Sequence, residues 1–550
     1  MKVVIIGGGA AGTAAATRLR RLNENAEILI LEKTGELAVA NCGLTYFLSE
    51  DIEDKRDLIG TTPEKLKRKY NIDVRLNTEV TAINRKEKTV SLAGKADESY
   101  DRLIIAIGAL QLRPDIEGIL TEQVFTLKDL ASVERIKDFI KFNAPKNAIV
   151  VGGGHTGLET AEALVKLGIH TTIAEASPHL LPQFDEDMAA PLHNYLRSKN
   201  LTLYPGKRVT AFDESRVTLS SGESLRYDLA VIATGVSPDL KLPVLADLEI
   251  GESGGIKVNE HMQTSDKDIY AAGDAVEVRD FVSKQPIRAA QAGLAVKQAK
   301  TAADALGGAA SEFKHALGTS VIKIFDMTAA AAGLNEKKLK ENNMEYYKLN
   351  LYDWDISSYM QGKELMLFKL LFSPDGQLLG AQGIGKNGID KRIDTIAAAM
   401  QLNAGTAGLE NLELCYSPLF SSAKDAVNNL GSMAQNIIEK RVKFAFYDDI
   451  NQKNVTDGTM IVDIRSPEQF KEGKIPNAVN IPLYALRNNL TSIPHEKKVV
   501  LYCQYGVGSY IAACLLSNRG FDNIYILSGG LQLYREITAD RQLTPDIVRI

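Results

Sequence analysis

The chain has 550 residues, far more than one hydrophobic core can order, so we expect three or four domains. Apolar residues make up 45% and charged residues 24%, as in ordinary globular proteins, and the net charge of −5 gives no argument for nucleic-acid binding. No apolar run approaches the roughly 20 residues that span a membrane. Four cysteines are too few for a disulfide scaffold, and the sequence enters a strand without a secretion-signal pattern. We therefore expect a cytoplasmic protein.

A glycine-rich loop follows the first apolar strand, at residues 3–6, and precedes a helix expected over residues 13–22. Its glycines can bring backbone N–H groups close to a pyrophosphate, and the helix N-terminus favours negative charge there. A second strand ends in an acid that would accept hydrogen bonds from a ribose. This order of elements is strong evidence for a dinucleotide site, although a tight turn without a ligand is the alternative. The residues are Gly7, Gly9, Gly12 and Glu32.

A second signal favours FAD at this first site. Residues 268–275 form an apolar strand that ends in Gly273 and Asp274, and the carboxylate is expected to bind a ribityl hydroxyl beside a following helix. Gly108 and Gly235 end two further strands of matching pattern. They are expected to mark where the chain crosses between the flavin domain and an inserted domain.

A second glycine-rich loop follows the strand at residues 148–151, and the next strand again ends in an acid, Glu175. A carboxylate accepts from the 2′-hydroxyl of NADH and repels the 2′-phosphate of NADPH, which usually recruits Arg. Residues 176–179 contain no Arg, so NADH is the expected cofactor. The role of Glu159 stays open between a position near the nicotinamide and an ordinary helix turn. The loop glycines are Gly152, Gly154 and Gly157.

Cys42 lies between the two loops in sequence, in a segment that enters a helix, where a thiolate is favoured. A redox disulfide with a near neighbour is excluded, because the partner positions hold Thr45 and Phe47. Cys42 is therefore expected to form a mixed disulfide or persulfide with a substrate, or a sulfenic acid. An inert buried thiol is the alternative.

The segment Asn41-Cys42-Gly43-Leu44, followed by Tyr46, resembles the active-site segment of the pyridine nucleotide-disulfide oxidoreductases. In particular, the chain resembles the single-cysteine coenzyme A-disulfide reductases over about residues 1–435, with Thr45 where that family usually has Pro. The resemblance implies FAD, NADH and coenzyme A as ligands. It also implies that Asn41 contacts the flavin and coenzyme A.

The same resemblance implies further site residues. Arg18 and Arg21 match contacts to coenzyme A, whose phosphates suit guanidinium groups. Tyr359 and Tyr416 match two tyrosines that approach the reacting sulfur. Because Tyr416 would come from the partner subunit, a homodimer is implied.

The last part of the chain resembles a rhodanese sulfurtransferase domain over about residues 446–540. Cys503 ends a strand, and the loop at 504–509 can point N–H groups at its sulfur before a helix begins. Many rhodaneses have Arg where this chain has Gly508, so turnover of a small anion is in doubt. A degenerate binding domain is the alternative, and Cys514 is expected in the core.

The predicted fold class is α/β, with two Rossmann-like FAD/NAD(P)-binding domains, an α+β dimerisation domain and a C-terminal rhodanese-like α/β domain. The predicted function is an FAD-dependent reductase that uses NADH on coenzyme A disulfide, persulfide or polysulfide through Cys42, with the rhodanese domain handling sulfane sulfur. An NADH oxidase or peroxidase and a flavin redox sensor stay open. We expect no metal, nucleic-acid or membrane partner. The predicted boundaries are 1–110 and 238–317 (FAD), 111–237 (NAD), 318–440 (dimerisation), 441–455 (linker) and 456–550 (rhodanese-like).

Overall fold

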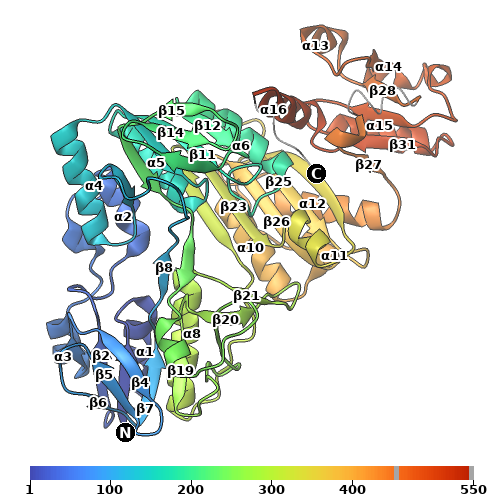
Figure 1. Cartoon of the computed structure of the whole chain (residues 1–550). Coiled ribbons are helices and arrows are strands. Elements are labelled where there is room, and N and C mark those ends of the chain that lie inside the picture. Colours follow the sequence, from blue (N-terminus) through green and yellow to red (C-terminus); the bar gives the residue numbers. More distant parts are fainter. Residues whose placement is uncertain (451–457, 544–550) are drawn as a thin grey trace. The chain divides into compact units, whose positions relative to one another are not determined.

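The computed structural model describes residues 1–450 and 458–543 (Figure 1). The chain forms two compact units. Unit 1 comprises Met1–Ala176 and Lys207–Ala316, and unit 2 comprises Ser177–Gly206 and Leu317–Ile550. Within the described ranges, no helix is long and apolar enough to cross a membrane.

The first sheet of unit 1 is parallel, in the order β19-β7-β1-β2-β3. Its central strand is buried on both faces, which explains its unbroken run of Val and Ile. Helix α1 begins at Ala10, three residues before the predicted start, and Gly9 is its N-cap residue. It packs against α8. The elements are β1 (Lys2–Ile6), α1 (Ala10–Leu22), β2 (Glu27–Leu31), β3 (Asp73–Arg75), β7 (Arg102–Ile105), β19 (Ile269–Ala271) and α8 (Ala292–Leu306).

A second parallel sheet repeats this plan, with the unit 1 strands in the order β11-β10-β16-β9. Strands β8 and β17 pair antiparallel directly after Gly108 and Gly235, so the two predicted crossing points lie side by side. The elements are β8 (Ala109–Gln111), β9 (Val124–Thr126), α4 (Leu130–Asn143), β10 (Asn147–Val151), α5 (His155–Lys166), β11 (His170–Glu175), β16 (Leu229–Ile232) and β17 (Val236–Pro238).

Smaller elements complete unit 1. Three small sheets have the orders β4-β5-β6, β13-β14-β15 and β18-β20-β21. Their strands, with two helices, are α3 (Pro63–Tyr70), β4 (Val80–Asn84), β5 (Thr89–Leu92), β6 (Glu98–Ser99), β13 (Val209–Phe212), β14 (Arg216–Leu219), β15 (Ser224–Arg226), α7 (Lys241–Leu245), β18 (Ile256–Lys257), β20 (Val276–Arg279) and β21 (Pro286–Arg288).

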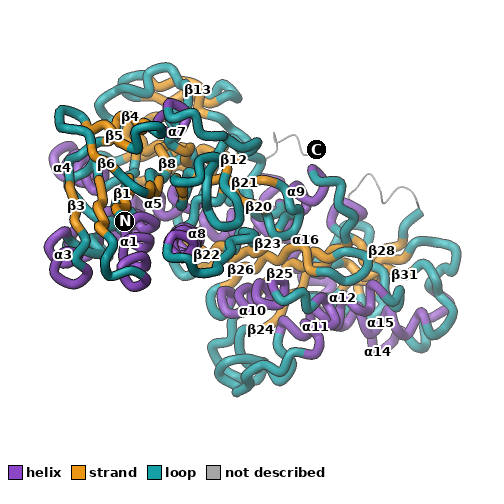
Figure 2. Tube along the Cα trace, turned by 90° about the horizontal axis from the view of Figure 1, so that it is seen from below, coloured by secondary structure: helices purple, strands orange, loops and turns teal. Residues whose placement is uncertain are grey.

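Unit 2 contains a five-stranded antiparallel sheet, in the order β22-β23-β26-β25-β24. Helices α10 and α12 cover one face of this sheet (Figure 2), and α6 packs on β25 and β26. The elements are α6 (Glu186–Ser198), β12 (Thr202–Pro205), β22 (Ser320–Ile324), β23 (Met327–Gly333), α9 (Glu336–Glu341), β24 (Tyr347–Trp354), β25 (Leu365–Phe372), β26 (Leu378–Gly385), α10 (Ile389–Gln401), α11 (Gly405–Asn411) and α12 (Ala426–Ile438).

The C-terminal part of unit 2 is a parallel sheet, in the order β27-β31-β30-β28-β29. Strand β27 lies inside the segment predicted as a linker, because Phe444 and Ala445 pair with β31; residues 451–455 of that linker lie outside the described residues. The elements are β27 (Phe444–Ala445), β28 (Met460–Asp463), α13 (Pro467–Glu472), β29 (Val479–Asn480), α14 (Leu483–Leu486), β30 (Val499–Tyr502), α15 (Val507–Ser517), β31 (Ile524–Leu527) and α16 (Gly530–Leu543).

Candidate functional site

The first glycine loop has the geometry that a dinucleotide needs. Gly7 has φ of +100°, and a Cβ on Gly12 would lie 1.9 Å from the Gly7 carbonyl oxygen, so both positions require glycine. A Cβ on Gly9 would meet nothing within 4 Å, which leaves open space beside the start of α1. The carboxylate of Glu32 accepts a hydrogen bond from the Gly8 N–H at 2.6 Å and so holds the loop against the end of β2. These residues fit a bound pyrophosphate and ribose.

The second loop repeats this arrangement at the start of α5. Gly152 has φ of +113°, a Cβ on Gly157 would lie 1.9 Å from the Gly152 carbonyl oxygen, and Gly154 faces open space. The carboxylate of Glu175 accepts from the Gly153 N–H at 2.6 Å. The two loops therefore share the same backbone geometry. In each, the acid at the end of the next strand accepts a hydrogen bond from a loop N–H.

Asp274 is the acidic residue expected at the flavin ribityl chain. Burial raises the pKa of its carboxyl. Such a half-buried carboxyl fits a ligand that brings hydroxyl donors. The preceding Gly273 has φ of +94° and donates its N–H to Gln298 at 2.7 Å. The helix that follows Asp274 in the chain is α8, which begins at Ala292 after the two strands β20 and β21.

Cys42 is exposed on a short 3₁₀ turn, Asn41–Gly43, immediately before α2 (Leu44–Leu48). The buried Thr45 hydroxyl donates a hydrogen bond to Glu159 at 3.0 Å. Burial raises the pKa of the Glu159 carboxyl, although the bond from Thr45 opposes the change. Glu159 thus reaches from α5, the helix of the second loop, to the helix that follows Cys42. The sequence left its role open, and only the fold shows this contact.

The two arginines that match coenzyme A contacts differ in environment. Arg18 donates to Asp304 at 2.6 Å, and its side chain is 30% exposed. Lys300 binds the same carboxylate at 2.5 Å. Arg21 is exposed one turn of α1 away. A ligand phosphate that takes Arg18 would have to compete with Asp304, whereas Arg21 is accessible to it.

Tyr359 and Tyr416 lie together in unit 2 although they are distant in sequence. Their hydroxyl oxygens are 3.4 Å apart, and the side chains are 71% and 50% exposed. The hydrogen bond between them lowers the pKa of Tyr359 and raises that of Tyr416. One phenol of the pair can therefore donate a proton to a ligand while the other stays hydrogen-bonded to it.

Cys503 follows β30 directly, and its sulfur accepts a hydrogen bond from the Gly506 N–H at 3.1 Å. Gly506 has φ of +111°, which favours glycine. Helix α15 already begins at Val507, so Gly508 and Ser509 belong to its first turn rather than to a loop as predicted. A Cβ on Gly508 would lie 3.6 Å from the Cys503 sulfur. A side chain at this position would therefore stand beside the thiol, and this chain has none.

Sequence reasoning gave no role to three side chains on the segments near Cys503. Arg465 is buried in an ion pair with Asp463 at 2.7 Å and also donates to the Gln504 side chain at 3.3 Å. The ring of Tyr505 packs against Trp354 of β24 at a centroid distance of 6.2 Å. Ser509 is fully buried, and its hydroxyl has no hydrogen-bond partner among the described residues. Tyr505 and Ser509 lie inside the predicted loop at 504–509 and Arg465 follows a predicted strand, but only the fold shows their burial and contacts.

Cys514 is partly buried and packs against the core of the C-terminal sheet, as predicted.

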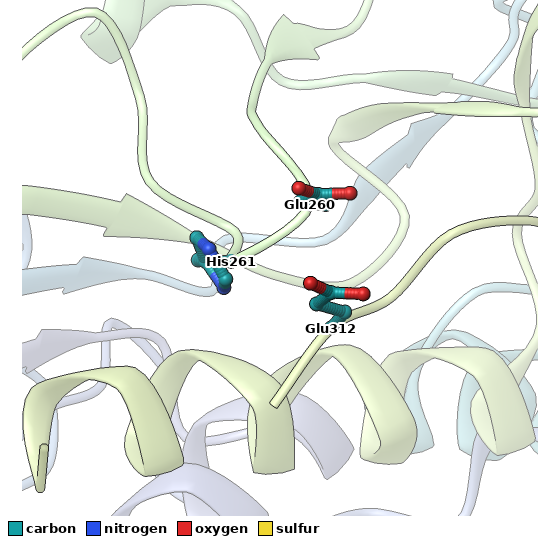
Figure 3. Close-up of side chains that lie close together, drawn as sticks. All are labelled: Glu260, His261 and Glu312. Carbon is teal, nitrogen blue, oxygen red and sulfur yellow. The ribbon is translucent and has the colours of Figure 1, made fainter. Parts of the chain in front are cut away.

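Glu260, His261 and Glu312 gather in unit 1 (Figure 3), with possible ligand atoms all within 4.8 Å of one another. Both glutamates are exposed. Lys314 pairs with Glu312 at 2.8 Å, and the His261 ring bonds the Ser311 carbonyl at 2.9 Å. These partners account for the group as ordinary surface residues.

Comparison with known families and proteins agrees with this geometry. Residues 1–305 match the pyridine nucleotide-disulphide oxidoreductases, 319–427 the dimerisation domain of those enzymes, and 445–536 the rhodanese-like domain. A coenzyme A disulfide reductase of Staphylococcus aureus (strain bovine RF122 / ET3-1) is 31% identical over 441 residues, which are 79% of this chain and 100% of that protein.

Two solved structures resemble the whole chain. Reduced Bacillus anthracis CoADR-RHD has a TM-score of 0.96 and 38% identity, covering 98% of both chains. An NAD-dependent persulfide reductase from A. fulgidus has a TM-score of 0.92 and 33% identity, covering 97% of this chain and 100% of that one. The fold class expected from the sequence is thereby confirmed.

Proposed function

This chain belongs to the pyridine nucleotide-disulphide oxidoreductase family, and we propose that it uses NADH to reduce coenzyme A disulfide and coenzyme A persulfide or polysulfide in the cytoplasm. The observation that carries the proposal is the exposed Cys42, which lies directly before α2, the helix that contacts Glu159 of α5 through Thr45. A lone exposed thiol in a chain with two dinucleotide loops suits attack on an external disulfide.

Two cofactors would be held by the loops described above. FAD would supply a two-electron carrier between the nicotinamide and the disulfide. The residues assigned to FAD are Gly7, Gly9, Gly12, Glu32, Asn41, Gly108, Gly273 and Asp274, and those assigned to NADH are Gly152, Gly154, Gly157, Glu159, Glu175 and Gly235.

Cys42 would attack as a thiolate. It forms a bond to one sulfur of coenzyme A disulfide, the S–S bond breaks, and one coenzyme A thiolate leaves and takes up a proton. Two electrons that originate from NADH then break the mixed disulfide, which restores the Cys42 thiolate and releases the second thiol after protonation. One NADH and one proton thus yield NAD⁺ and two coenzyme A thiols. With coenzyme A persulfide the same balance yields one thiol and one hydrogen sulfide.

The tyrosine pair would protonate the leaving thiolate, since Tyr359 and Tyr416 share a hydrogen bond and are both exposed. By the family pattern, Tyr416 serves the Cys42 of the partner subunit. We therefore infer a homodimer, which the match of residues 319–427 to a dimerisation domain supports. Arg18, Arg21 and Asn41 are assigned to coenzyme A.

An acceptor panel tests the proposal. NADH oxidation by the FAD-loaded enzyme is followed under anaerobic conditions with coenzyme A disulfide, coenzyme A persulfide and polysulfide. We expect turnover with at least one of them, and sulfide release with the last two. NADH consumption only in parallel assays with oxygen or with peroxide would instead identify an oxidase or peroxidase. Negligible turnover with every acceptor would favour the redox-sensor interpretation.

We predict that the enzyme prefers NADH over NADPH by at least about tenfold in kcat/KM, or about 1.4 kcal/mol. The reason is the carboxylate of Glu175, which lies at the second loop and would repel a 2′-phosphate. Steady-state kinetics with both nucleotides measures the ratio. Comparable kcat/KM values would refute the preference.

We predict that Cys503→Ser impairs the use of polysulfide or elemental sulfur by at least about tenfold, because a hydroxyl cannot carry sulfane sulfur. Reduction of coenzyme A disulfide should persist. Without a side chain at Gly508, Cys503 has no neighbouring cation there, so thiosulfate should be a poor donor.

Cys514→Ser in the same domain is the matched control. Steady-state rates on both substrate types show whether Cys503→Ser loses only the use of sulfane sulfur. Mass spectrometry after sulfur loading shows whether a persulfide forms on Cys503. If Cys503→Ser equals wild type on every donor, or if no persulfide forms on Cys503, the domain is not a sulfur carrier.

A further inference from the structure

Unit 2 contains a pocket that none of the residues assigned above lines. Its volume is about 540 Å³, inside the range of roughly 300–1,000 Å³ that is usual for small-molecule sites. The lining comes from three segments: α9, the start of β24, and the stretch from the end of α12 through β27. The residues are Glu336, Lys340, Tyr346, Tyr347, Lys348, Ile437, Lys440, Val442, Lys443, Phe444 and Phe446.

The charge of this pocket is positive. Glu336 is its one acidic lining residue, and that carboxylate already accepts hydrogen bonds from Tyr346 and Lys348, each at 2.8 Å, and pairs with the buried Lys369. Burial favours the neutral acid, but Lys369 and Lys348 outweigh it and hold the Glu336 pKa far below its ordinary value. Glu336 is therefore a charged group that is fully paired.

The other three lysines of the lining, unlike Lys348, pair with no carboxylate among the described residues. Lys340 and Lys440 are exposed and form no ion pair among the described residues. Lys443 donates to the backbone carbonyl of Asp522 at 2.8 Å, which is a neutral acceptor. The pocket is therefore lined by three lysines that no carboxylate in the described part of the chain pairs with, from α9 and from the α12–β27 connection. Such an arrangement favours a ligand with more than one negative charge.

The remaining lining is aromatic and apolar. Four rings, from two sequence-distant segments, contribute to it, and the ammonium of Lys348 lies 4.5 Å from the Phe446 ring centroid. Tyr347 is 37% exposed, so part of its ring is accessible. Rings of this kind give a flat surface on which a nucleobase can stack, and stacking contributes about 1–3 kcal/mol per base in single-stranded nucleic-acid sites.

We propose that this pocket binds a nucleoside phosphate, with the base against the aromatic lining and the phosphates against Lys340, Lys440 and Lys443. An inorganic anion would leave the aromatic lining unused, and an apolar molecule would leave three cations without a counter-charge. A free adenine nucleotide and the 3′-phospho-ADP end of coenzyme A share this chemistry. The site does not depend on the reaction proposed at Cys42.

The test is photolabelling of the full-length, FAD-loaded enzyme with 8-azidoadenosine 3′,5′-bisphosphate, in saturating NAD⁺ to occupy the second loop. Labelled peptides are mapped by mass spectrometry. We expect label within residues 336–348 or 437–446, displaced by ADP and by coenzyme A but not by an equal concentration of inorganic phosphate. Stronger displacement by coenzyme A than by ADP would identify its nucleotide end as the source, and equal displacement a free nucleotide.

Two charge reversals on different segments of the pocket lining sharpen the test. Lys340→Glu and Lys440→Glu should each lower the labelling about fivefold, the effect of roughly 1 kcal/mol. Lys337→Glu is the matched control, because Lys337 is exposed on the same helix but does not line the pocket. It should leave the labelling unchanged.

The proposal is overturned if the label maps only to other peptides, if inorganic phosphate competes as well as ADP, or if Lys337→Glu has the same effect as Lys340→Glu. Circular dichroism and the thermal unfolding midpoint of each variant show that it is folded. Because labelling needs no turnover, an enzyme inactive on every sulfur acceptor would refute the reductase proposal and leave this one standing.

Discussion

Cys42→Ser is expected to lower the rate of coenzyme A disulfide reduction by at least ~10³-fold while FAD and NADH still bind. Serine keeps the size of the side chain but cannot form the S–S bond that the reaction requires. Cys42 is exposed on its turn, so the substitution should not disturb packing. Steady-state rates measure the loss, and a rapid-mixing half-reaction should still show flavin reduction by NADH.

Cys415→Ser is the control for this prediction, since Cys415 is also an exposed free thiol and has no assigned role. It should keep near-normal turnover. Near-normal reduction of coenzyme A disulfide by the Cys42→Ser enzyme would remove Cys42 from the mechanism. A variant that loses its flavin would show instead that the Cys42 turn holds the cofactor.

Lys369→Met is expected to lower the free energy of unfolding by about 3–5 kcal/mol, as for other buried ion pairs that lose one partner. Lys369 is fully buried in the middle of β25. Its ammonium lies 2.7 Å from Asp187 and 3.1 Å from Asp185, and it also pairs with Glu336. Burial alone would lower the pKa of Lys369, but these carboxylates raise it well above its ordinary value. Methionine fills the space and leaves three acids without their shared cation.

Denaturant unfolding of the holoenzyme measures this change, and Lys323→Met is the control because Lys323 is exposed on β22 of the same sheet. The control should change stability by less than about 0.5 kcal/mol. The difference in unfolding free energy between the wild type and Lys369→Met should also become smaller in acid. Glu336 has a depressed pKa in the folded wild type, so its contribution to stability is present above the ordinary carboxyl pKa and is lost as the pH falls through the folded value. If Lys369→Met and Lys323→Met lowered the free energy of unfolding equally, the stabilising role of the Lys369 ion pairs would be contradicted.

The fold class and the two nucleotide loops could be predicted from local sequence, for a physical reason. A strand, a tight turn and a helix are set by neighbouring residues, and the turn demands glycine at Gly7 and Gly152, where φ is positive. The acid at the end of the next strand then lies beside that turn, and Glu32 and Glu175 each bond to their own loop.

Boundaries were less predictable where tertiary pairing decides them. Phe444 and Ala445 fall inside the predicted linker, residues 441–455, yet they form β27 by pairing with β31. The helix that follows Asp274, α8, begins only after the β20–β21 hairpin, whose length the local sequence does not show. Neither outcome follows from propensity, since pairing partners far along the chain supply the hydrogen bonds.

The sequence by itself determined the kind of protein: two dinucleotide loops, a lone Cys42 between them and a second thiol, Cys503, at a strand end. Each of these is a short-range pattern that a few adjacent residues specify. Only the tertiary structure decided which distant groups meet, because those contacts depend on how sheets and helices pack. Folding alone brings Thr45 to Glu159 and Tyr359 to Tyr416, and it alone gathers the lysines of the unit 2 pocket from separate segments.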